Sequence, residues 1–189
     1  MRLAATALLL SLALPNADAA EPPASIRQAL AAHDRAVWVK DGWVRDPYII
    51  LAPDGFYYYT GTTQPQGKPE ETYNTGLGPK SLVGWQMPLW RSRDLVEWES
   101  LGIRFTMEDG IWFRAQRERF SATPRDQWRL WAPELHWMDG KWGLVHTSPA
   151  PVPGANFALS AGAEPKGPWS HPLGESIGKR HDPSLFRDD

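Results

Sequence analysis

Short runs of alternating apolar and polar residues follow one another from about residue 44 to the end of the chain. They are rich in Tyr, Trp, Val and Ile, and turn sequences with Gly, Pro and Asp separate them. A period of two residues is typical of β-strands. Before these runs, a helical spacing of apolar residues follows Ser25, a possible N-cap. The pattern therefore predicts an all-β fold preceded by one short helix or an irregular segment.

One hairpin pattern occurs twice along the chain. The sequences DPYIILAPDGFYYYTGT and APELHWMDGKWGLVHTS each contain two β-rich runs around an Asp-Gly pair, Asp54-Gly55 in the first and Asp139-Gly140 in the second. Asp-Gly favours a tight hairpin turn, in which both central residues need positive φ. Each copy starts with a proline and ends in Thr or Ser, which indicates two copies of one structural unit.

A second pattern also recurs, directly after each hairpin. MPLWRSRDLVEWE and NFALSAGAEPKGPWS both run from an apolar strand through a Ser into a polar turn and then a Trp, at Trp98 and Trp169. Four strands in a repeated order are typical of propeller blades, which bury their faces only against neighbouring blades. A β-sandwich would also contain short strands, but it does not require the same landmarks to return in order. The final DPSLF repeats the start of the first unit and predicts the first strand of a third blade.

Two stretches interrupt the repeats. Residues 64–80 are rich in Pro, Gly and Thr, and residues 105–127 are dense in Arg and Glu with scattered aromatic residues. Both are predicted to be loops, the first inside a blade and the second between blades. Such loops either shape the rim of a pocket or are surface excursions, and the sequence leaves this choice open.

Composition narrows the classes of function. The chain has 189 residues, no Cys and a formal net charge of −2, so thiol catalysis is excluded and no basic surface for nucleic acid is expected. Its eleven Trp are far more than ordinary usage. Such residues build a β-rich core or provide flat apolar platforms for sugar rings. If they are platforms, a carbohydrate is the expected partner; the oligomeric state is not predicted.

The first residues have the pattern of a secretory signal peptide. A positive residue, Arg2, precedes an apolar run of Leu and Ala, and the small-residue sequence Ala17-Asp18-Ala19 follows. The alternative is a buried N-terminal helix. No stretch reaches the roughly 18 to 20 apolar residues of a membrane span. We expect a signal peptide at 1–19, a lead-in segment at 20–43 and a β-propeller domain at 44–189, in a secreted or periplasmic protein.

Carboxylates occur near the start of each repeat, at Asp46, Glu134 and Asp182, each beside a proline. The innermost strands of a propeller line its central channel, so equivalent positions of successive blades bring such residues together. Hydrolysis of a glycosidic bond needs one carboxylate to activate water and one protonated carboxyl group to donate to the leaving oxygen. A third charge can raise the pKa of the acid. An isolated Asp before a Pro is more often only a turn residue.

Other candidate side chains have weaker support. His136 and His146 are predicted to share one face of the second hairpin, but no third ligand follows at a suitable spacing, so we expect no metal site and no cofactor. Trp131 and Trp90 are candidate platforms for sugar stacking, as are Trp43 and Trp85. Most of the tryptophans must instead pack the blades.

The ordered set RDPYIILAPDGFYYYTGT, SRDLVEWE, WAPELHWMDGKWGLVHTS, EPKGPW and HDPSLF resembles glycoside hydrolase family 43 from about Val44 to the end of the chain. The resemblance implies a five-bladed β-propeller that hydrolyses arabinofuranosides, β-xylosides or related plant-polysaccharide linkages with inversion. It implies that Asp46 is the general base and that Asp182 tunes the pKa of the general acid and orients it. Glu134 is implied to lie near the pocket without donating the proton.

The sequence differs from the family pattern in the general acid. The resemblance implies a Glu downstream of the strand that Asp182 begins, and the sequence stops at Asp189. We therefore expect an N-terminal fragment with about two blades, the first strand of a third, and no general acid. Two alternatives remain open: a propeller that binds carbohydrate without catalysis or an inactive fragment, and a related propeller enzyme that acts on other sugars such as fructosides. The sugar cleaved, and exo or endo action, are not predicted.

Overall fold

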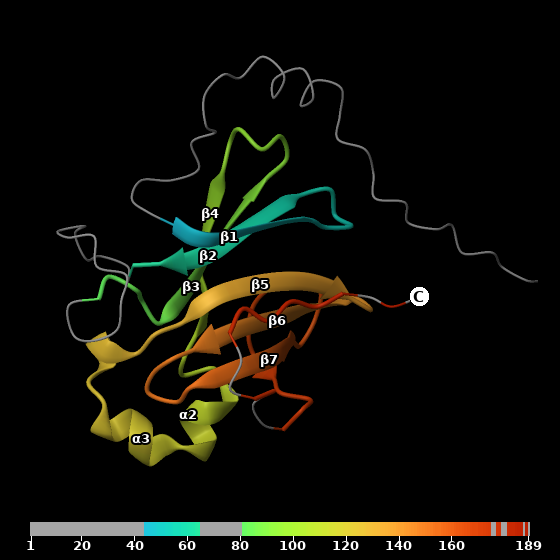
Figure 1. The fold of residues 1–189 in the computed structure, drawn as a ribbon. Coiled ribbons are helices and arrows are strands. Elements are labelled where there is room, and N and C mark those ends of the chain that lie inside the picture. Colours follow the sequence, from blue (N-terminus) through green and yellow to red (C-terminus); the bar gives the residue numbers. More distant parts are fainter. Residues whose placement is uncertain (1–43, 65–80, 175–176, 179–180, 187, 189) are drawn as a thin grey trace, which may run out of the picture. The chain divides into compact units, whose positions relative to one another are not determined.

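The computed structural model in Figure 1 describes residues 44–64, 81–174, 177–178, 181–186 and 188. All of them belong to Arg35–Asp189, the second of the two units into which the chain divides. The predicted signal peptide, the lead-in segment, Trp43 and residues 65–80 of the predicted insertion lie outside the described residues. Within the part of the chain that is described, no helix has the length and apolar character needed to cross a bilayer.

The strands form two four-stranded antiparallel sheets, and in each sheet the strands pair in chain order. The first sheet contains β1 (Val44–Leu51), β2 (Tyr57–Thr63), β3 (Gln86–Ser92) and β4 (Glu99–Thr106). The second contains β5 (Trp131–Met138), β6 (Lys141–Ser148), β7 (Gly154–Ser160) and β8 (Trp169–Ser170). These sheets are the two blades that the repeated landmarks predict, so the prediction of an all-β, partial propeller is confirmed.

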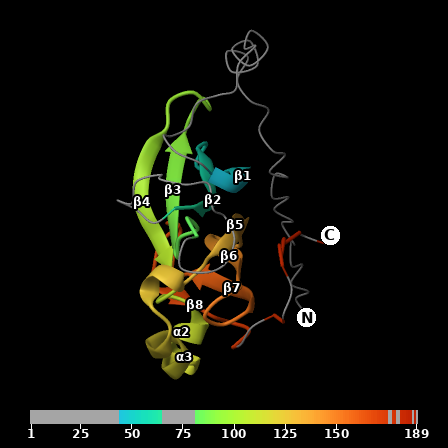
Figure 2. The same cartoon turned by 60° about the vertical axis from the view of Figure 1, so that its left-hand side comes forward.

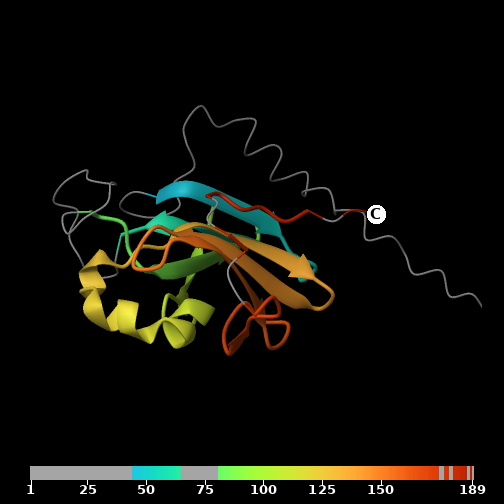
Figure 3. The same cartoon turned by 60° about the horizontal axis from the view of Figure 1, so that its bottom comes forward.

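The two sheets pack against each other through large aromatic side chains. The rings of Tyr58 and Trp142, which come from different sheets, lie 4.8 Å apart between centroids. Trp169 contacts the ring of Phe105 and donates its Nε1–H to the backbone oxygen of Arg104 at 2.9 Å. β5 also contacts β1 and β2, and Figures 1 and 3 show it beside these two strands. Several of the eleven tryptophans are therefore used to join the blades.

The two Asp-Gly turns differ in structure. Asp139 and Gly140 have φ of 46° and 81° in a two-residue turn that joins β5 to β6, as the sequence predicts. At the first turn the prediction of two positive φ angles is wrong, because only Gly55 has positive φ, at 79°. Its N–H donates to the oxygen of Ala52 at 3.0 Å, so Pro53 is the second residue of the turn. The proline ring fixes φ near −65° and favours a type I turn there.

Residues 105–127 are not the loop that their sequence predicts. β4 continues to Thr106, and two short helices follow, α2 (Ile111–Ala115) and α3 (Arg117–Ala122), with the 3-10 turn η1 (Arg125–Gln127) after them. Figure 2 shows both helices beside the lower end of the sheets. Trp112 and Phe120 are buried, and the Phe120 ring packs edge-on against Trp128 at 4.9 Å. Helices this short depend on such packing, because an isolated turn or two is unstable in water.

The described residues at 181–186 do not form the strand that the motif DPSLF predicts. A strand exists only through hydrogen bonds to a neighbouring strand, and the described residues place none beside this segment. Asp182, the first residue of the motif, nevertheless has a positive φ angle, as Asp46 and Ala132 do in the earlier repeats.

Candidate functional site

Three residues at repeat starts share one unusual backbone conformation. Asp46, Ala132 and Asp182 have φ of 51°, 42° and 51°, and each directly precedes a proline. Residues with a side chain rarely adopt positive φ, and each such residue costs on the order of 1–3 kcal/mol. The same costly conformation at three repeat starts identifies the equivalent positions of the three repeats.

This alignment corrects the position that the sequence suggested for the second repeat. Ala132, and not Glu134, is equivalent to Asp46, while Glu134 is equivalent to Tyr48. In both sheets the ladder register shifts at this point, between Arg45 and Tyr48 in the first and between Trp131 and Glu134 in the second. A bulge of this kind turns the chain and re-aims its side chains. The equivalent position therefore carries a carboxylate only in the first and third repeats.

Of the residues that precede these three positions, two contact the third. The guanidinium carbon of Arg45 lies 5.3 Å from the centroid of the Trp131 ring, and the ring of His181 lies 5.8 Å from Trp131. Arg45, Trp131 and His181 directly precede Asp46, Ala132 and Asp182. The structure thus brings the starts of three repeats, far apart in sequence, to one place around Trp131, as the propeller prediction requires.

The Asp46 carboxylate is anchored through one oxygen. Oδ2 accepts hydrogen bonds from the hydroxyl of Thr62 at 2.9 Å and from Nε of Arg45 at 3.1 Å. The described residues give Oδ1 no hydrogen-bond partner, and the side chain is 38% exposed. A partly exposed carboxylate that is anchored through one oxygen can accept a proton from a water molecule.

Gly61 allows this part of β1 to come close to β2. A Cβ atom at Gly61 would lie 2.9 Å from the backbone oxygen of Arg45 and 3.3 Å from that of Asp46. Both distances are shorter than ordinary van der Waals contacts, and backbone atoms cannot move aside easily. Sequence reasoning assigned no role to Gly61 or Thr62, although the hairpin pattern included a Thr at this end of the strand.

Glu134 belongs to a chain of hydrogen bonds that runs through His136 to Tyr48 and joins the two sheets. Its Oε2 lies 3.1 Å from Nε2 of His136, and Nδ1 of His136 lies 3.3 Å from the hydroxyl of Tyr48. A proton on Nε2 satisfies both contacts, since Nε2–H then donates to Glu134 and the phenol donates to Nδ1. Burial raises the pKa of Tyr48, and the charge of Glu134 raises it further. The Glu134 side chain is 22% exposed and its carboxylate is held beside the repeat starts.

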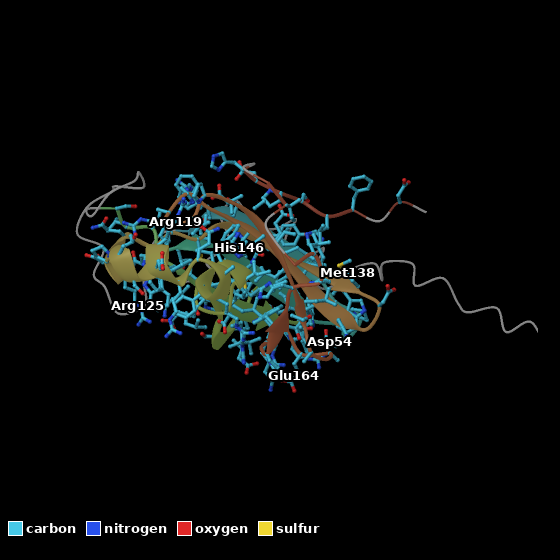
Figure 4. The ribbon with its side chains drawn as sticks, turned by 90° about the horizontal axis from the view of Figure 1, so that it is seen from below. Asp54, Arg119, Arg125, Met138, His146 and Glu164 are labelled. Atoms are coloured by element: carbon cyan, nitrogen blue, oxygen red, sulfur yellow. The ribbon has the colours of Figure 1, made fainter. Side chains whose placement is uncertain are left out.

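His136 and His146 lie on opposite faces of the second sheet, so the prediction that they share a face is wrong. His136 pairs with Gly143 across a two-residue turn, which puts even-numbered residues of β5 beside odd-numbered residues of β6. His146, labelled in Figure 4, is fully buried beside Phe105 and Trp112. No group of three or more His, Asp or Glu able to hold a metal ion occurs among the residues that the structure describes.

Burial keeps His146 neutral. Desolvation lowers the pKa of its imidazole to about 4, and the nearby His171 adds to this effect. Nδ1 lies 3.3 Å from the oxygen of Thr147, and Nε2 lies 3.1 Å from Nδ2 of Asn156. A neutral ring with its proton on Nδ1 donates to Thr147 and accepts from Asn156. His146 is therefore a packing residue of the core.

The two candidate sugar platforms lie in different surroundings. Trp131 is at the centre of the contacts among repeat starts, partly exposed. Trp90 lies on β3, which β2 separates from β1, and its ring packs 5.6 Å from that of Tyr59. Tyr59 also contacts Trp98 at 5.6 Å. The structure brings Asp46, Trp131 and the segment of Asp182 together, with Glu134 nearby, and it leaves Trp90 in an aromatic cluster of the first sheet.

Two cavities are lined by other residues than the repeat-start positions. One, of about 420 Å³, is lined by basic residues such as Arg91 and Lys166 and by acidic residues. Asp54 and Glu164, two of the acidic residues, are labelled in Figure 4. The other, of about 480 Å³, is lined by Ile50, His136 and Trp137 together with Leu185 and Phe186. Neither is lined by Asp46, Trp131 or Asp182.

Comparison with known proteins identifies relatives of this chain. The sequence model of Glycosyl hydrolases family 43 matches residues 38–189. A candidate beta-xylosidase of Escherichia coli (strain K12) is 34% identical over 109 residues, which are 53% of this chain and 18% of that protein. The chain therefore spans less than a fifth of the length of this curated relative.

Solved structures share the fold. A beta-xylosidase/alpha-arabinofuranosidase from a compost microbial metagenome, in complex with xylotriose, matches with a TM-score of 0.53 and 20% identity, over 80% of this chain and 41% of that one. An endo-1,4-beta-xylanase from Bacteroides thetaiotaomicron matches with a TM-score of 0.50 and 24% identity, over 77% of this chain and 39% of that one. The chain spans about two fifths of each of these structures.

Proposed function

The chain belongs to glycoside hydrolase family 43, and from this membership we propose that the protein hydrolyses glycosidic bonds of xylan- or arabinan-type carbohydrates with inversion of configuration. The observation that carries the proposal is the state of Asp46, whose Oδ2 is anchored while its side chain is 38% exposed, next to Arg45, which contacts Trp131. The relatives' names, xylosidase, arabinofuranosidase and xylanase, support the substrate class.

In the proposed reaction Asp46 is the general base. Its Oδ1 accepts a proton from the attacking water, while the hydrogen bonds to Oδ2 keep the carboxylate in one orientation. Inverting enzymes hold base and acid about 6.5–9.5 Å apart, which leaves room for this water. The acid protonates the leaving oxygen, and we assign it to no residue of this chain.

Asp182 has a supporting role in this proposal. It shares the backbone conformation of Asp46 at the equivalent repeat position, and its neighbour His181 contacts Trp131. A second carboxylate beside the acid keeps the acid protonated by like-charge repulsion. Trp131 offers a flat apolar face for a sugar ring, and Glu134, held by His136, offers carboxylate oxygens to sugar hydroxyls.

The substitution Asp46→Asn tests the base directly in the native protein. Asn keeps the shape of the side chain but cannot accept the proton, so we expect turnover to fall by about 10²- to 10⁴-fold. Hydrolysis of 4-nitrophenyl β-D-xyloside and of 4-nitrophenyl α-L-arabinofuranoside measures this, and calorimetry measures xylotriose binding. The matched control is Asp139→Asn, because Asn also suits the turn conformation at Asp139.

The outcomes separate the proposal from its alternative. Loss of turnover with retained xylotriose binding in Asp46→Asn, and full activity in Asp139→Asn, support the general base. Proton NMR of the first-formed sugar anomer then tests inversion. If the native protein binds xylotriose but hydrolyses no glycoside, it is a carbohydrate-binding propeller. If Asp46→Asn retains normal turnover, Asp46 is not the base.

A further inference from the structure

Thr62 is completely buried on β2, one strand away from Asp46, and its hydroxyl joins the two blades. Oγ1 accepts the backbone N–H of Ala132 at 2.8 Å, and the same atom lies 2.9 Å from Oδ2 of Asp46. One hydroxyl group therefore contacts the carboxylate in the first repeat and the equivalent backbone position in the second.

The two contacts fix the direction of the hydroxyl proton. A backbone N–H can only donate, so Thr62 must accept from Ala132, and an ionised carboxylate can only accept, so Thr62 must donate to Asp46. Hydrogen bonds to an ionised group are stronger than neutral ones. Because the hydroxyl is buried and already accepts the N–H of Ala132, it has little freedom to rotate away from Oδ2.

The second repeat shows which contact the equivalent threonine, Thr147, makes where no carboxylate is present. Thr62 is paired with Arg45 and Thr147 with Trp131, so the two threonines occupy equivalent positions. Ala132 provides no carboxylate, and the hydroxyl of Thr147 lies 3.4 Å from the backbone oxygen of Trp131. Of the two repeats whose hairpins the structure describes, the one that carries Asp46 has the contact with a carboxylate.

We propose that Thr62 is a positioning residue for the general base, and that its hydroxyl holds Oδ2 of Asp46 so that Oδ1 faces the attacking water. The inference rests on the proposed role of Asp46. It also makes the position of the base depend on the second blade, because the N–H of Ala132 orients the hydroxyl that orients the carboxylate. Arg45, the other partner of Oδ2, is more exposed and is the weaker constraint.

Thr62→Val in the native protein removes the hydroxyl and keeps the shape of the side chain. We expect kcat to fall by about 10- to 100-fold, as for a small displacement of a catalytic group, while xylotriose binding stays within about twofold. Thr62→Ser restores the hydroxyl and should restore most of kcat. The matched control is Thr60→Val, because Thr60 is also buried on β2 and its hydroxyl donates to the oxygen of Pro88 at 2.9 Å, away from Asp46.

A double variant separates positioning from general loss of structure. In the Asp46→Asn background, Thr62→Val should lower the residual turnover no further, because the group it positions is already disabled. If Thr62→Val unfolds the protein, Thr62→Ser and Thr62→Cys replace it. Both lack the γ-methyl group, and the thiol of Cys is a much weaker donor, so kcat should fall only in the Cys variant. Equal kcat for Thr62→Val and native protein, or an equal loss in Thr60→Val, overturns the inference. Normal turnover in Asp46→Asn overturns the proposed function itself.

Discussion

Asp46 and Asp182 have the same left-handed backbone conformation, with φ of 51° at both, although they belong to different repeats. In each case the conformation turns the chain immediately before a proline, and in each case the preceding residue contacts Trp131. A conformation that costs free energy at two distant positions persists only where the surrounding structure enforces it. This relationship is the geometric basis for treating the two carboxylates as members of one site.

Replacing Asp182 should change the pH dependence of hydrolysis as well as its rate. In the proposed role of Asp182, Asp182→Asn removes a like charge beside the general acid, so the acid should lose its proton more readily. The alkaline limb of the kcat profile should therefore move to lower pH and kcat should fall. Asp188→Asn, an exposed carboxylate in the same segment, is the control. An unchanged alkaline limb in Asp182→Asn would remove this role from Asp182.

Gly61→Ala should damage both folding and activity. The added methyl group would lie 2.9 Å from the backbone oxygen of Arg45, and relief requires movement of the bulge that carries Asp46. Overpacking of this kind costs about 1–3 kcal/mol, and the displaced carboxylate should lower kcat. Chemical denaturation and turnover of the purified variant measure the two effects. Gly162→Ala is the control, since a Cβ at Gly162 would meet nothing within 4 Å; equal behaviour of both variants contradicts the steric argument.

Tyr48→Phe should loosen the connection between β1 and β5. The phenol hydroxyl is lost, and Nδ1 of His136 is left without the partner that lies 3.3 Å away in the native protein. We expect the free energy of unfolding to fall by about 1 kcal/mol. Tyr57→Phe, on the neighbouring strand, serves for comparison. If both substitutions have the same effect on a urea denaturation curve, the contact with His136 contributes no stability.

Stability should decrease as the pH falls from about 6.5 to about 4. His146 is neutral and buried in the folded state, where its pKa is about 4, whereas in the unfolded chain it binds a proton near pH 6.5. The unfolded state therefore binds more protons in this window, and stability rises with pH across it. The pKa difference corresponds to roughly 3 kcal/mol.

Denaturation curves of the native protein and of His146→Gln between pH 4 and pH 7 measure this contribution. The slope of stability against pH should be smaller in the variant, while His171→Gln should leave most of the slope in place. A slope that is unchanged in His146→Gln would assign the acid sensitivity to other groups.

Residues 1–19 are proposed to direct export. We expect the exported protein to begin at Ala20, because cleavage follows the small-residue pattern that ends at Ala19. Intact-mass measurement of the protein recovered outside the cytoplasm of a bacterial host tests this. Leu9→Arg interrupts the apolar run and should retain the uncleaved chain inside the cell. An exported protein that still carries Met1 would show that these residues are not removed.

The sequence by itself determined the repeated unit and most of its landmarks. The alternation of apolar residues, the Asp-Gly pairs and the recurring Trp98 and Trp169 are local signals, because strand period, turn chemistry and residue size act over a few neighbouring positions. For the same reason the carboxylates Asp46 and Asp182 could be selected as candidates from their place beside a proline in a repeat.

Only the tertiary structure decided how these residues meet. Ala132, and not Glu134, occupies the position in the second repeat that is equivalent to Asp46. The reason is a shift of the ladder register at a bulge, which residue composition does not reveal. The faces of His136 and His146 depend on the length of one turn, and the helices at residues 111–122 depend on burial of their aromatic side chains. The hydroxyl of Thr62 meets Asp46 when β1 pairs with β2, and it meets the N–H of Ala132 only when the two blades pack together.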